Sequence, residues 1–350
     1  MSGDYERDEN EEDDLKATAS SRAPSSSASL SAAKLGELRR ALSGLSSEVR
    51  SQQRRAFKPE KESKGGAAWS SLFDELRSLV GTLGMVEREP VVDDFGMQRD
   101  FVERVGPLFD FLYDRYWRVT LRGEERIPYK GPAVFVANRS GVLPWDGMML
   151  AHAIAKSSSQ IGRPRFLVQD AVLRLPFAQA QLSRVGGVRA CAENLGPLLA
   201  RGHSAVAFPE ATRGALHSFR GRYQVQSFAG SDAIRLAVEA GVPIVPVGIV
   251  GAEEAYPRLG DSSTLRKFAS REIRLPQLPI TPTFPMLGPL GLLPLPSKWV
   301  IEIGEPVFAR DFPLEDETAS LGAPKLGDAL QAEVQRLVEL ALDARPATWL

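Results

Sequence analysis

Two loops of the chain carry charged side chains directly after runs of apolar residues. The first loop, NRSGVLPWDG, follows AVFVA and contains Arg139 and Asp146. The second loop, FPEATRG, follows SAVA and places Glu210 and Arg213 three residues apart. In a parallel α/β sheet, functional groups lie on the loops that leave the carboxyl ends of the strands. Carboxylates there can accept a proton and guanidinium groups can bind an anion, but a Glu–Arg pair can also simply fix a turn as an ion pair.

The elements that would position these loops are short apolar segments that alternate with helical ones from about Trp117 onward. Strands that are apolar throughout and separated by helices indicate a largely parallel sheet covered by helices on both faces. The sequence therefore predicts an α/β domain over residues 118–350, preceded by N-terminal helices and a disordered N-terminal tail. The expected strands are WRVTL, AVFVAN, RFLVQ, SAVAFP, PIVPVGIVG and WVIEIGEPV, and the expected helices are DGMMLAHAIA, NLGPLLARG, GSDAIRLAVEAG and a last one around 325–343.

The first third of the chain differs from the rest in amino-acid composition and in hydrophobic pattern. Residues 1–31 are acidic and then rich in Ser and Ala, with too few apolar groups to form a core, which predicts a disordered tail. Residues 32–66 contain a basic amphipathic helix and a linker; this helix fits either a short coiled coil or a surface that lies on a membrane or a partner. Residues 67–117 contain two further amphipathic helices, which we expect to pack on the core.

Composition and charge limit the classes of function. The first fourteen residues carry a net charge of −7, which leaves +6 on the rest and suits a surface that faces phosphate or anionic lipid. A single cysteine, Cys191, excludes an intramolecular disulfide and fits a reducing compartment. No run reaches the roughly 18 apolar residues that span a bilayer, and the acidic N-terminus is not a signal peptide. We expect a cytoplasmic protein with peripheral membrane contact, no metal site and no nucleic-acid partner.

The second loop is one of four sequence blocks that together resemble, in the same order, the conserved blocks of a known family. FPEATRG resembles the FPEGTR block of the glycerolipid acyltransferases, the PlsC superfamily that includes the lysophosphatidate acyltransferases. RVTLRGEERIPYKGPAVFVANRSGVLPWDG is similar to the first block, RVGGVRACAENLGPLLARG to the second and GVPIVPVGIVGAEEAYP to the fourth. LGPLGLLPLPSKWVIEIGEPV resembles a tail of the bacterial, diacylglycerol-acyltransferase-like branch. The ordered set, over about residues 115–310, is far more specific than any one block.

The resemblance implies an acyltransferase of phospholipid biosynthesis or remodelling. Such an enzyme moves an acyl group from a thioester of coenzyme A or acyl carrier protein to a lysophospholipid or similar glycerolipid hydroxyl, with no bound cofactor. Its implied partners are the thioester donor, the lipid acceptor and the cytoplasmic face of a membrane. The resemblance assigns substrate binding to Glu210 and Arg213 of the third block and to Gly187 and Arg189 of the second.

One residue departs from the family pattern. In the first block the family has a His that acts as base and an Asp that holds it; Asp146 matches the Asp, but Arg139 stands at the His position. An arginine side chain stays protonated in proteins, so it cannot be a general base. His152, six residues after Asp146 in the next helix, would leave a different helical face.

Three accounts of the altered site remain open. Another group takes the proton, with His217 after the third block as the candidate. Alternatively, Arg139 and Asp146 form an ion pair, and catalysis proceeds slowly by positioning and electrostatics. In the third account the domain is a catalytically inactive lipid-binding or membrane-associated scaffold, with Arg139, Arg189 and Arg213 gathered around an anion.

Overall fold

The computed structural model describes most of the chain beyond residue 90. The described residues are 91–141, 143–157, 160–174, 178–210, 221–255, 294–308 and 319–348, together with Ser71, Asp74, Glu75 and Ser78. The chain divides into two units, residues 1–70 and 71–350, and all described residues belong to the second. The predictions for the tail, for the basic helix with its linker, and for most of the helix around residues 69–83 lie outside the described residues.

Seven strands form one sheet in the order β1-β7-β6-β2-β5-β3-β4. The five neighbours from β6 to β4 run parallel, which confirms the predicted parallel sheet. The pair β1 and β7 runs the other way, because β7 is antiparallel to β6 and parallel to β1. Val300 at the start of β7 pairs with Val250 at the end of β6. The strands are β1 (Thr120–Arg122), β2 (Val134–Ala137), β3 (Arg165–Val168), β4 (Gly187–Arg189), β5 (Ala205–Ala207), β6 (Ile244–Val250) and β7 (Val300–Ile303).

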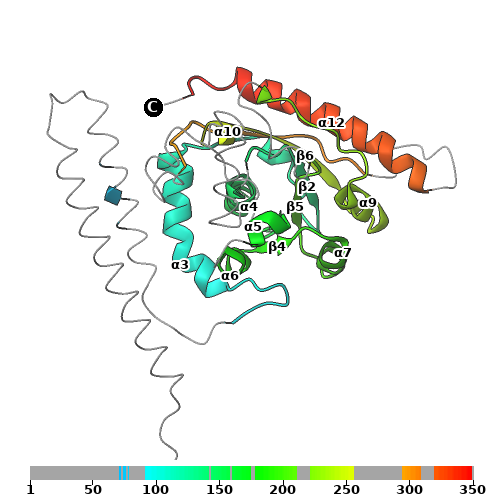
Figure 1. The fold of residues 1–350 in the computed structure, drawn as a ribbon, viewed down its shortest axis with the longest axis horizontal. Helices are drawn as coiled ribbons and strands as arrows, with labels where there is room; N and C mark the ends of the chain where they lie inside the picture. Colours follow the sequence, from blue (N-terminus) through cyan, green and yellow to red (C-terminus); the bar gives the residue numbers. More distant parts are fainter. Residues whose placement is uncertain are drawn as a thin grey trace, which may run out of the picture. The chain divides into compact units, whose positions relative to one another are not determined.

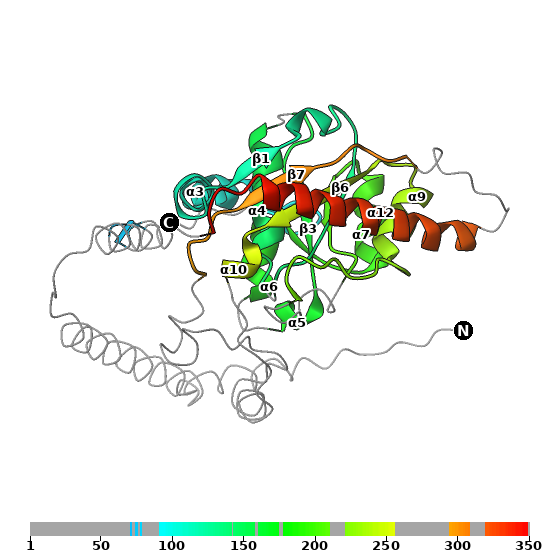
Figure 2. The same cartoon turned by 90° about the horizontal axis from the view of Figure 1, so that it is seen from above.

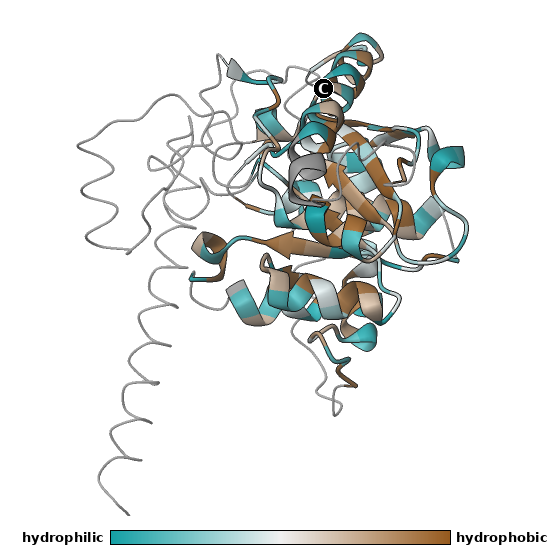
Figure 3. Ribbon diagram, turned by 90° about the vertical axis from the view of Figure 1, so that its right-hand side faces the viewer, coloured by the Kyte–Doolittle hydropathy of each residue, from teal (hydrophilic) through white to brown (hydrophobic). Residues whose placement is uncertain are grey.

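Helices cover both faces of the sheet, as predicted (Figure 1). Side chains of β6 alternate between the faces: Val245, Val247 and Ile249 join one core, and Ile244 and Val250 join the other. The strands β2, β5 and β6 are apolar throughout, and Figure 3 shows strands of the sheet coloured as hydrophobic. On the first face lie α3 (Arg99–Asp110), the π-helix η1 (Phe111–Tyr116) and α4 (Trp145–Ser157); on the second lie α7 (Ala192–Ala200), α9 (Asp232–Glu239) and α12 (Ala319–Asp343).

Several boundaries differ from the sequence prediction. The first strand begins at Thr120 rather than Trp117, because Arg118 has a left-handed backbone with φ of 47°. The last helix begins at Ala319, earlier than predicted. The structure adds β4, which the sequence did not predict, and four short helices: η2 (Glu124–Arg126), α5 (Asp170–Leu173), α6 (Ala178–Arg184) and α10 (Ala252–Ala255). Among the described residues, no helix combines the length and the apolar character needed to cross a membrane.

The long helix α12 lies directly on the sheet (Figure 2). Gly248 of β6 makes this contact close: a Cβ atom there would lie 2.6 Å from the carbonyl carbon of Leu337 and 2.7 Å from the backbone nitrogen of Val338. Real side chains do not approach backbone atoms so closely. The absence of a side chain at Gly248 therefore sets the depth at which α12 packs across β6.

The substitution Gly248→Ala is expected to lower the free energy of unfolding by about 1–3 kcal/mol, because the added methyl group must displace the α12 backbone. Urea denaturation followed by circular dichroism measures this change. Gly196→Ala in α7 is the matched control, because nothing lies within 4 Å of a Cβ atom there, and it should not lower the free energy of unfolding, since alanine favours a helix interior over glycine. Equal effects at the two glycines would contradict the packing argument.

Candidate active site

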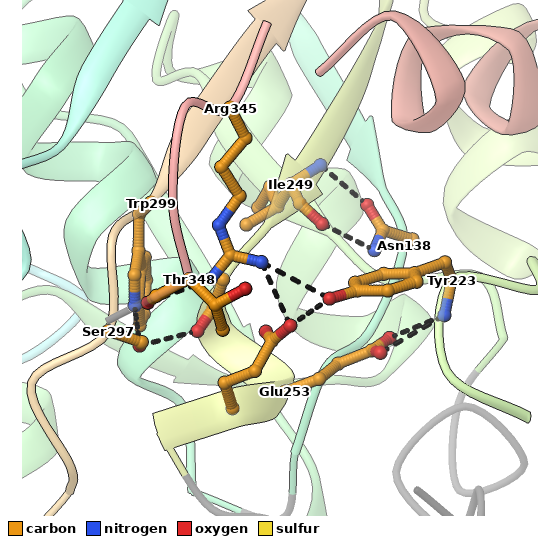
Figure 4. A network of polar contacts seen from close by, with 10 residues as sticks. Asn138, Tyr223, Ile249, Glu253, Ser297, Trp299, Arg345 and Thr348 are labelled. Atoms are coloured by element: carbon orange, nitrogen blue, oxygen red, sulfur yellow. Dashed lines mark hydrogen bonds and ion pairs between the residues drawn. The ribbon is translucent and has the colours of Figure 1, made fainter. Parts of the chain in front are cut away.

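The first loop leaves the sheet at a fixed point beyond β2. Asn138 donates from its side chain to the carbonyl oxygen of Ile249 at 2.9 Å and accepts the Ile249 N–H at 2.7 Å. The side chain thus continues the pairing of β2 with β6 by one residue, as the upper part of Figure 4 shows. Asn138 is buried, so both bonds are shielded from water. Arg139 follows immediately, and its backbone position is therefore defined by the sheet.

Arg139 is buried completely, with a side-chain exposure of 0%. Its Nε donates to the carbonyl oxygen of Gly141 at 2.9 Å, and the guanidinium carbon lies 5.0 Å from the centre of the Phe208 ring. One terminal nitrogen, Nη1, lies 4.0 Å from Oδ1 of Asp146. The guanidinium is thus held between an aromatic face and a carboxylate, which corresponds to the ion pair of the second account.

Asp146 lies in the first turn of α4, where a carboxylate is stabilised by the helix dipole. Its carboxylate accepts the backbone N–H of Ser140 at 3.2 Å and that of Gly147 at 2.8 Å. Burial raises the pKa of Asp146 above its usual range, while the Arg139 cation and these N–H groups oppose the rise. The carboxylate therefore closes the loop on itself, because it holds both ends of the segment from Ser140 to Gly147.

Glu210 joins the first loop to the second. Its Oε2 accepts the backbone N–H of Arg139 at 2.9 Å, and its Oε1 accepts that of Gln226 at 2.7 Å. Burial raises the pKa of Glu210 to about 7, and the negative charge of Asp146 adds to the rise, while the two N–H donors oppose it. Glu210 is only 1% exposed, so it acts from inside the protein, where it ties the ends of β2 and β5 to the segment before α9.

This raised pKa predicts a pH dependence of stability. The carboxyl group titrates near 4.5 when unfolded and at about 7 when folded, so its favourable contribution is complete below about pH 4.5 and is lost as the pH rises through 7. The free energy of unfolding of the wild type, measured relative to Glu210→Gln in urea titrations, should therefore fall by about 1–3 kcal/mol between pH 5 and pH 8. Parallel pH profiles for the two proteins would contradict the assignment.

A further carboxylate cluster lies beside Glu210, and the sequence analysis did not single it out. Both oxygens of Glu253, which follows β6 in α10, accept the backbone N–H of Tyr223, at 3.3 and 3.0 Å. Burial and the negative charge of Glu210 raise the pKa of Glu253 to about 8, while Arg222 and Arg345 oppose the rise. The signal was present, because GAEEAYP places two carboxylates just after a buried strand, where FPEATRG places one.

The neighbouring Glu254 anchors the C-terminal segment to this cluster. Its Oε1 pairs with Nη1 of Arg345 at 2.8 Å and also accepts the Tyr223 hydroxyl. Arg345 reaches from the end of the chain into the group (Figure 4), and its Nη2 donates to the carbonyl oxygen of Thr348 at 3.4 Å. The side chains of Arg345 and Glu254 are both buried, so the ion pair fixes the segment beyond α12 against the carboxyl end of β6.

The second-block residues lie on the outermost strand, β4, with Gly187 at its amino end and Arg189 at its carboxyl end. Arg189 is exposed and binds Asp170 through two nitrogens, at 2.7 and 2.8 Å. Gly187 has a packing role, because a Cβ atom there would lie 2.9 Å from the carbonyl oxygen of Leu182 and 3.0 Å from the Phe166 ring. β5 and β3 stand between β4 and β2, so the structure does not bring Arg189 to Arg139.

Of the two histidines considered in the sequence analysis, His152 is among the described residues and His217 is not. His152 packs between the rings of Phe109 and Tyr113 and lies 3.1 Å from Asp110 of α3, away from Asp146. The prediction that it leaves a different helical face is confirmed. His217 and Arg213 lie outside the described residues.

Together these contacts give a buried charged site at the carboxyl ends of β2, β5 and β6. It contains the buried Arg139 cation and carboxylates with raised pKa values, which can position substrates and stabilise charge. No metal cluster of three or more His, Cys, Asp or Glu side chains occurs among the described residues.

Comparison with known proteins identifies the family. The Acyltransferase family model matches residues 118–250, which contain Arg139, Asp146 and Glu210. An uncharacterized protein of Mycobacterium tuberculosis is 37% identical over 73% of this chain and 70% of its own length. Another of Mycobacterium leprae is 36% identical over 80% and 76%, respectively. The crystal structure of the 1-acyl-sn-glycerophosphate (LPA) acyltransferase PlsC from Thermotoga maritima is 20% identical, with a TM-score of 0.45, over 79% of this chain and 90% of that chain. The chain belongs to the Acyltransferase family.

Proposed function

We propose that the protein transfers an acyl group from a thioester donor to a glycerolipid hydroxyl, with a lysophospholipid such as lysophosphatidate as acceptor. The observation that carries this proposal is the bond between the Glu210 carboxylate and the backbone N–H of Arg139, at 2.9 Å. It joins the two loops that correspond to the first and third family blocks. Asp146 completes the group through its contact with Arg139.

In the proposed reaction the acceptor hydroxyl oxygen bonds to the thioester carbonyl carbon. The carbon–sulfur bond then breaks, and the hydroxyl proton ends on the released thiol. No acyl-enzyme is required. Arg139 can donate hydrogen bonds but cannot take the proton, so the reaction relies on positioning and on stabilisation of negative charge. The loss of a positioned base typically costs about 10²–10⁴ in rate, and we therefore propose slow turnover.

Asp146 and Glu210 act as positioning residues in this proposal. Each carboxylate holds two backbone N–H groups, and each is 1% exposed. Arg213, which stands in the third block, would bind the acceptor phosphate, because its planar guanidinium can make two hydrogen bonds to phosphate. The acceptor is a membrane lipid, so we place the enzyme peripherally on the cytoplasmic face of a membrane.

A second candidate is a catalytically inactive lipid-binding or membrane-associated scaffold. It is favoured by the burial of Arg139, whose side chain occupies the position of the family base and is 0% exposed. In this account the same loops bind a lipid head group without acyl transfer.

Acyl transfer by the purified protein separates the two candidates. A panel of acyl thioesters of coenzyme A and acyl carrier protein is offered with lysophosphatidate, and the acylated lipid is measured by mass spectrometry. We expect slow, acceptor-dependent product formation that Glu210→Ala abolishes. Arg336→Ala on the exposed side of α12 serves as the control for handling and should match the wild type. If the wild type forms no product with any donor, the acyltransferase proposal is wrong and the inactive lipid-binding scaffold is the remaining candidate.

A further inference from the structure

A second group of charged side chains, outside the two loops that carry Arg139 and Glu210, lies at the same edge of the sheet. It consists of Arg118 before β1, Lys298 before β7 and Arg345 beyond α12. The reversed direction of β1 and β7 brings the amino ends of these strands to the edge where the parallel strands end. Lys298 joins the other two: its Nζ donates to the carbonyl oxygen of Arg118, and its backbone N–H donates to that of Thr348 at 3.0 Å.

The group carries more positive than negative charge. Arg345 has a carboxylate partner, Glu254, at 2.8 Å. Among the described residues, the Lys298 side chain binds only uncharged oxygens, the Arg118 carbonyl and the Thr120 hydroxyl, the latter at 2.6 Å. Burial and the neighbouring cations lower the pKa of Lys298, and burial together with Arg345 lowers that of Arg118. Within the described part of the chain, neither Arg118 nor Lys298 forms an ion pair.

Arg118 is unusual in two further respects. Its backbone is left-handed, with φ of 47°, a conformation that costs a residue with a Cβ roughly 1–2 kcal/mol. Its Nε and Nη2 atoms are buried and have no hydrogen-bond partner in the part of the chain that the structure describes. Strained backbones and unpaired buried donors persist mainly where function requires them. Arg118 and Lys298 are each only partly buried, so part of each of these two residues reaches the surface, whereas the Arg345 side chain is 4% exposed.

Two contacts connect this group with the candidate active site. Trp117, which precedes Arg118, stacks on Trp299 at 4.5 Å and meets the ring of Trp145 at 5.5 Å. Trp145 immediately precedes Asp146. Glu254, the carboxylate partner of Arg345, adjoins Glu253 in α10, and the pKa of Glu253 is raised by the charge of Glu210 and lowered by that of Arg345.

We propose that Arg118, Lys298 and Arg345 form a binding site for a phosphate group of a substrate. Guanidinium and ammonium groups are the side chains that bind phosphate, and phosphate oxygens would satisfy the unpaired nitrogens of Arg118. The phosphate could come from the coenzyme A part of a donor or from a glycerol phosphate acceptor. This assignment of substrate chemistry rests on the proposed function, but binding does not require turnover.

The test is calorimetric titration at constant ionic strength with four probes: inorganic phosphate, coenzyme A, dephospho-coenzyme A and sn-glycerol 3-phosphate. We expect coenzyme A or glycerol phosphate to bind, and Arg118→Asn to weaken that binding about 10- to 100-fold, as for the loss of charge-assisted hydrogen bonds. Lys298→Met should weaken it as well. Arg235→Asn on the exposed face of α9 removes the same charge elsewhere and should leave the affinity within about twofold.

Thermal unfolding separates a binding role of Arg118 from a structural one. Asparagine tolerates the left-handed conformation, so Arg118→Asn should unfold at the same or a higher temperature than the wild type. Selective binding of coenzyme A over dephospho-coenzyme A would assign the donor 3′-phosphate, and binding of glycerol phosphate would assign the acceptor. Unchanged affinity in Arg118→Asn and Lys298→Met, binding of inorganic phosphate alone, or a lower unfolding temperature for Arg118→Asn would overturn the proposal. Failure of acyl transfer with these results intact would overturn only the proposed reaction.

Discussion

Replacing Arg139 by histidine is expected to raise the rate of acyl transfer by about 10²–10⁴, the contribution typical of a positioned general base. The rest of the arrangement is already present: Glu210 holds the backbone N–H of residue 139, and Asp146 lies beside its side chain. An imidazole at this position can accept the hydroxyl proton, and a carboxylate next to it would orient the ring. The initial rate of acylated lipid formation, at saturating donor and acceptor, measures the change.

The control for this gain is Arg139→Gln, which removes the cation without supplying a base. It should stay at or below the wild-type rate, and its pH profile should show no new titration near the pKa of histidine, about 6.5. A rise of equal size in Arg139→Gln and Arg139→His would mean that the cation inhibits the reaction. A histidine variant that is folded but no faster than the wild type would contradict the assignment of position 139.

The largest expected effect on stability is that of Asp146→Asn. The substitution leaves the buried Arg139 guanidinium without its carboxylate, and loss of one partner from a buried ion pair typically costs about 3–5 kcal/mol. It also replaces one acceptor oxygen by an amide donor, opposite the N–H group of either Ser140 or Gly147. The free energy of unfolding from urea denaturation at pH 7 is the quantity to measure.

A double-mutant cycle separates the ion pair from the two backbone hydrogen bonds. Arg139→Met removes the cation and retains most of the apolar contact with Phe208. The double variant Arg139→Met/Asp146→Asn should therefore be more stable than Asp146→Asn alone, because no unpaired charge remains in the interior. Strict additivity of the two single substitutions would show that the 4.0 Å contact contributes no coupling energy.

The sequence predicted the centre of the sheet better than its edges. The segments AVFVAN, SAVAFP and PIVPVGIVG contain β2, β5 and β6, because strands buried on both faces must be apolar along their whole length. β4 has only three residues and ends in an exposed Arg189, so it carries no such pattern. The reversed direction of β1 and β7 is a property of long-range strand pairing, for which the sequence carries no local signal.

At the site, the sequence predicted the residues but not all of their contacts. It placed Arg139, Asp146 and Glu210 on loops at the carboxyl ends of the strands, because parallel neighbouring strands all end on the same side of the sheet. The raised pKa values of Glu210 and Glu253 arise from burial and from contacts across the sheet, which spacing along the chain does not encode. Arg189 matched a family block, but it lies on β4, separated from β2 by β5 and β3, and pairs with Asp170 of α5; this strand order could not be read from the sequence.

The most direct test is a single experiment in which purified wild-type protein is incubated with an isotopically labelled acyl thioester and lysophosphatidate, and the labelled product is identified. We predict that label appears slowly on the acceptor hydroxyl, with one equivalent of thiol released for each acylated lipid, and that Arg139→His forms the same product faster. Labelled lipid from Arg139→His together with none from the wild type would contradict the account, because it would show that Arg139 has abolished catalysis in the natural protein.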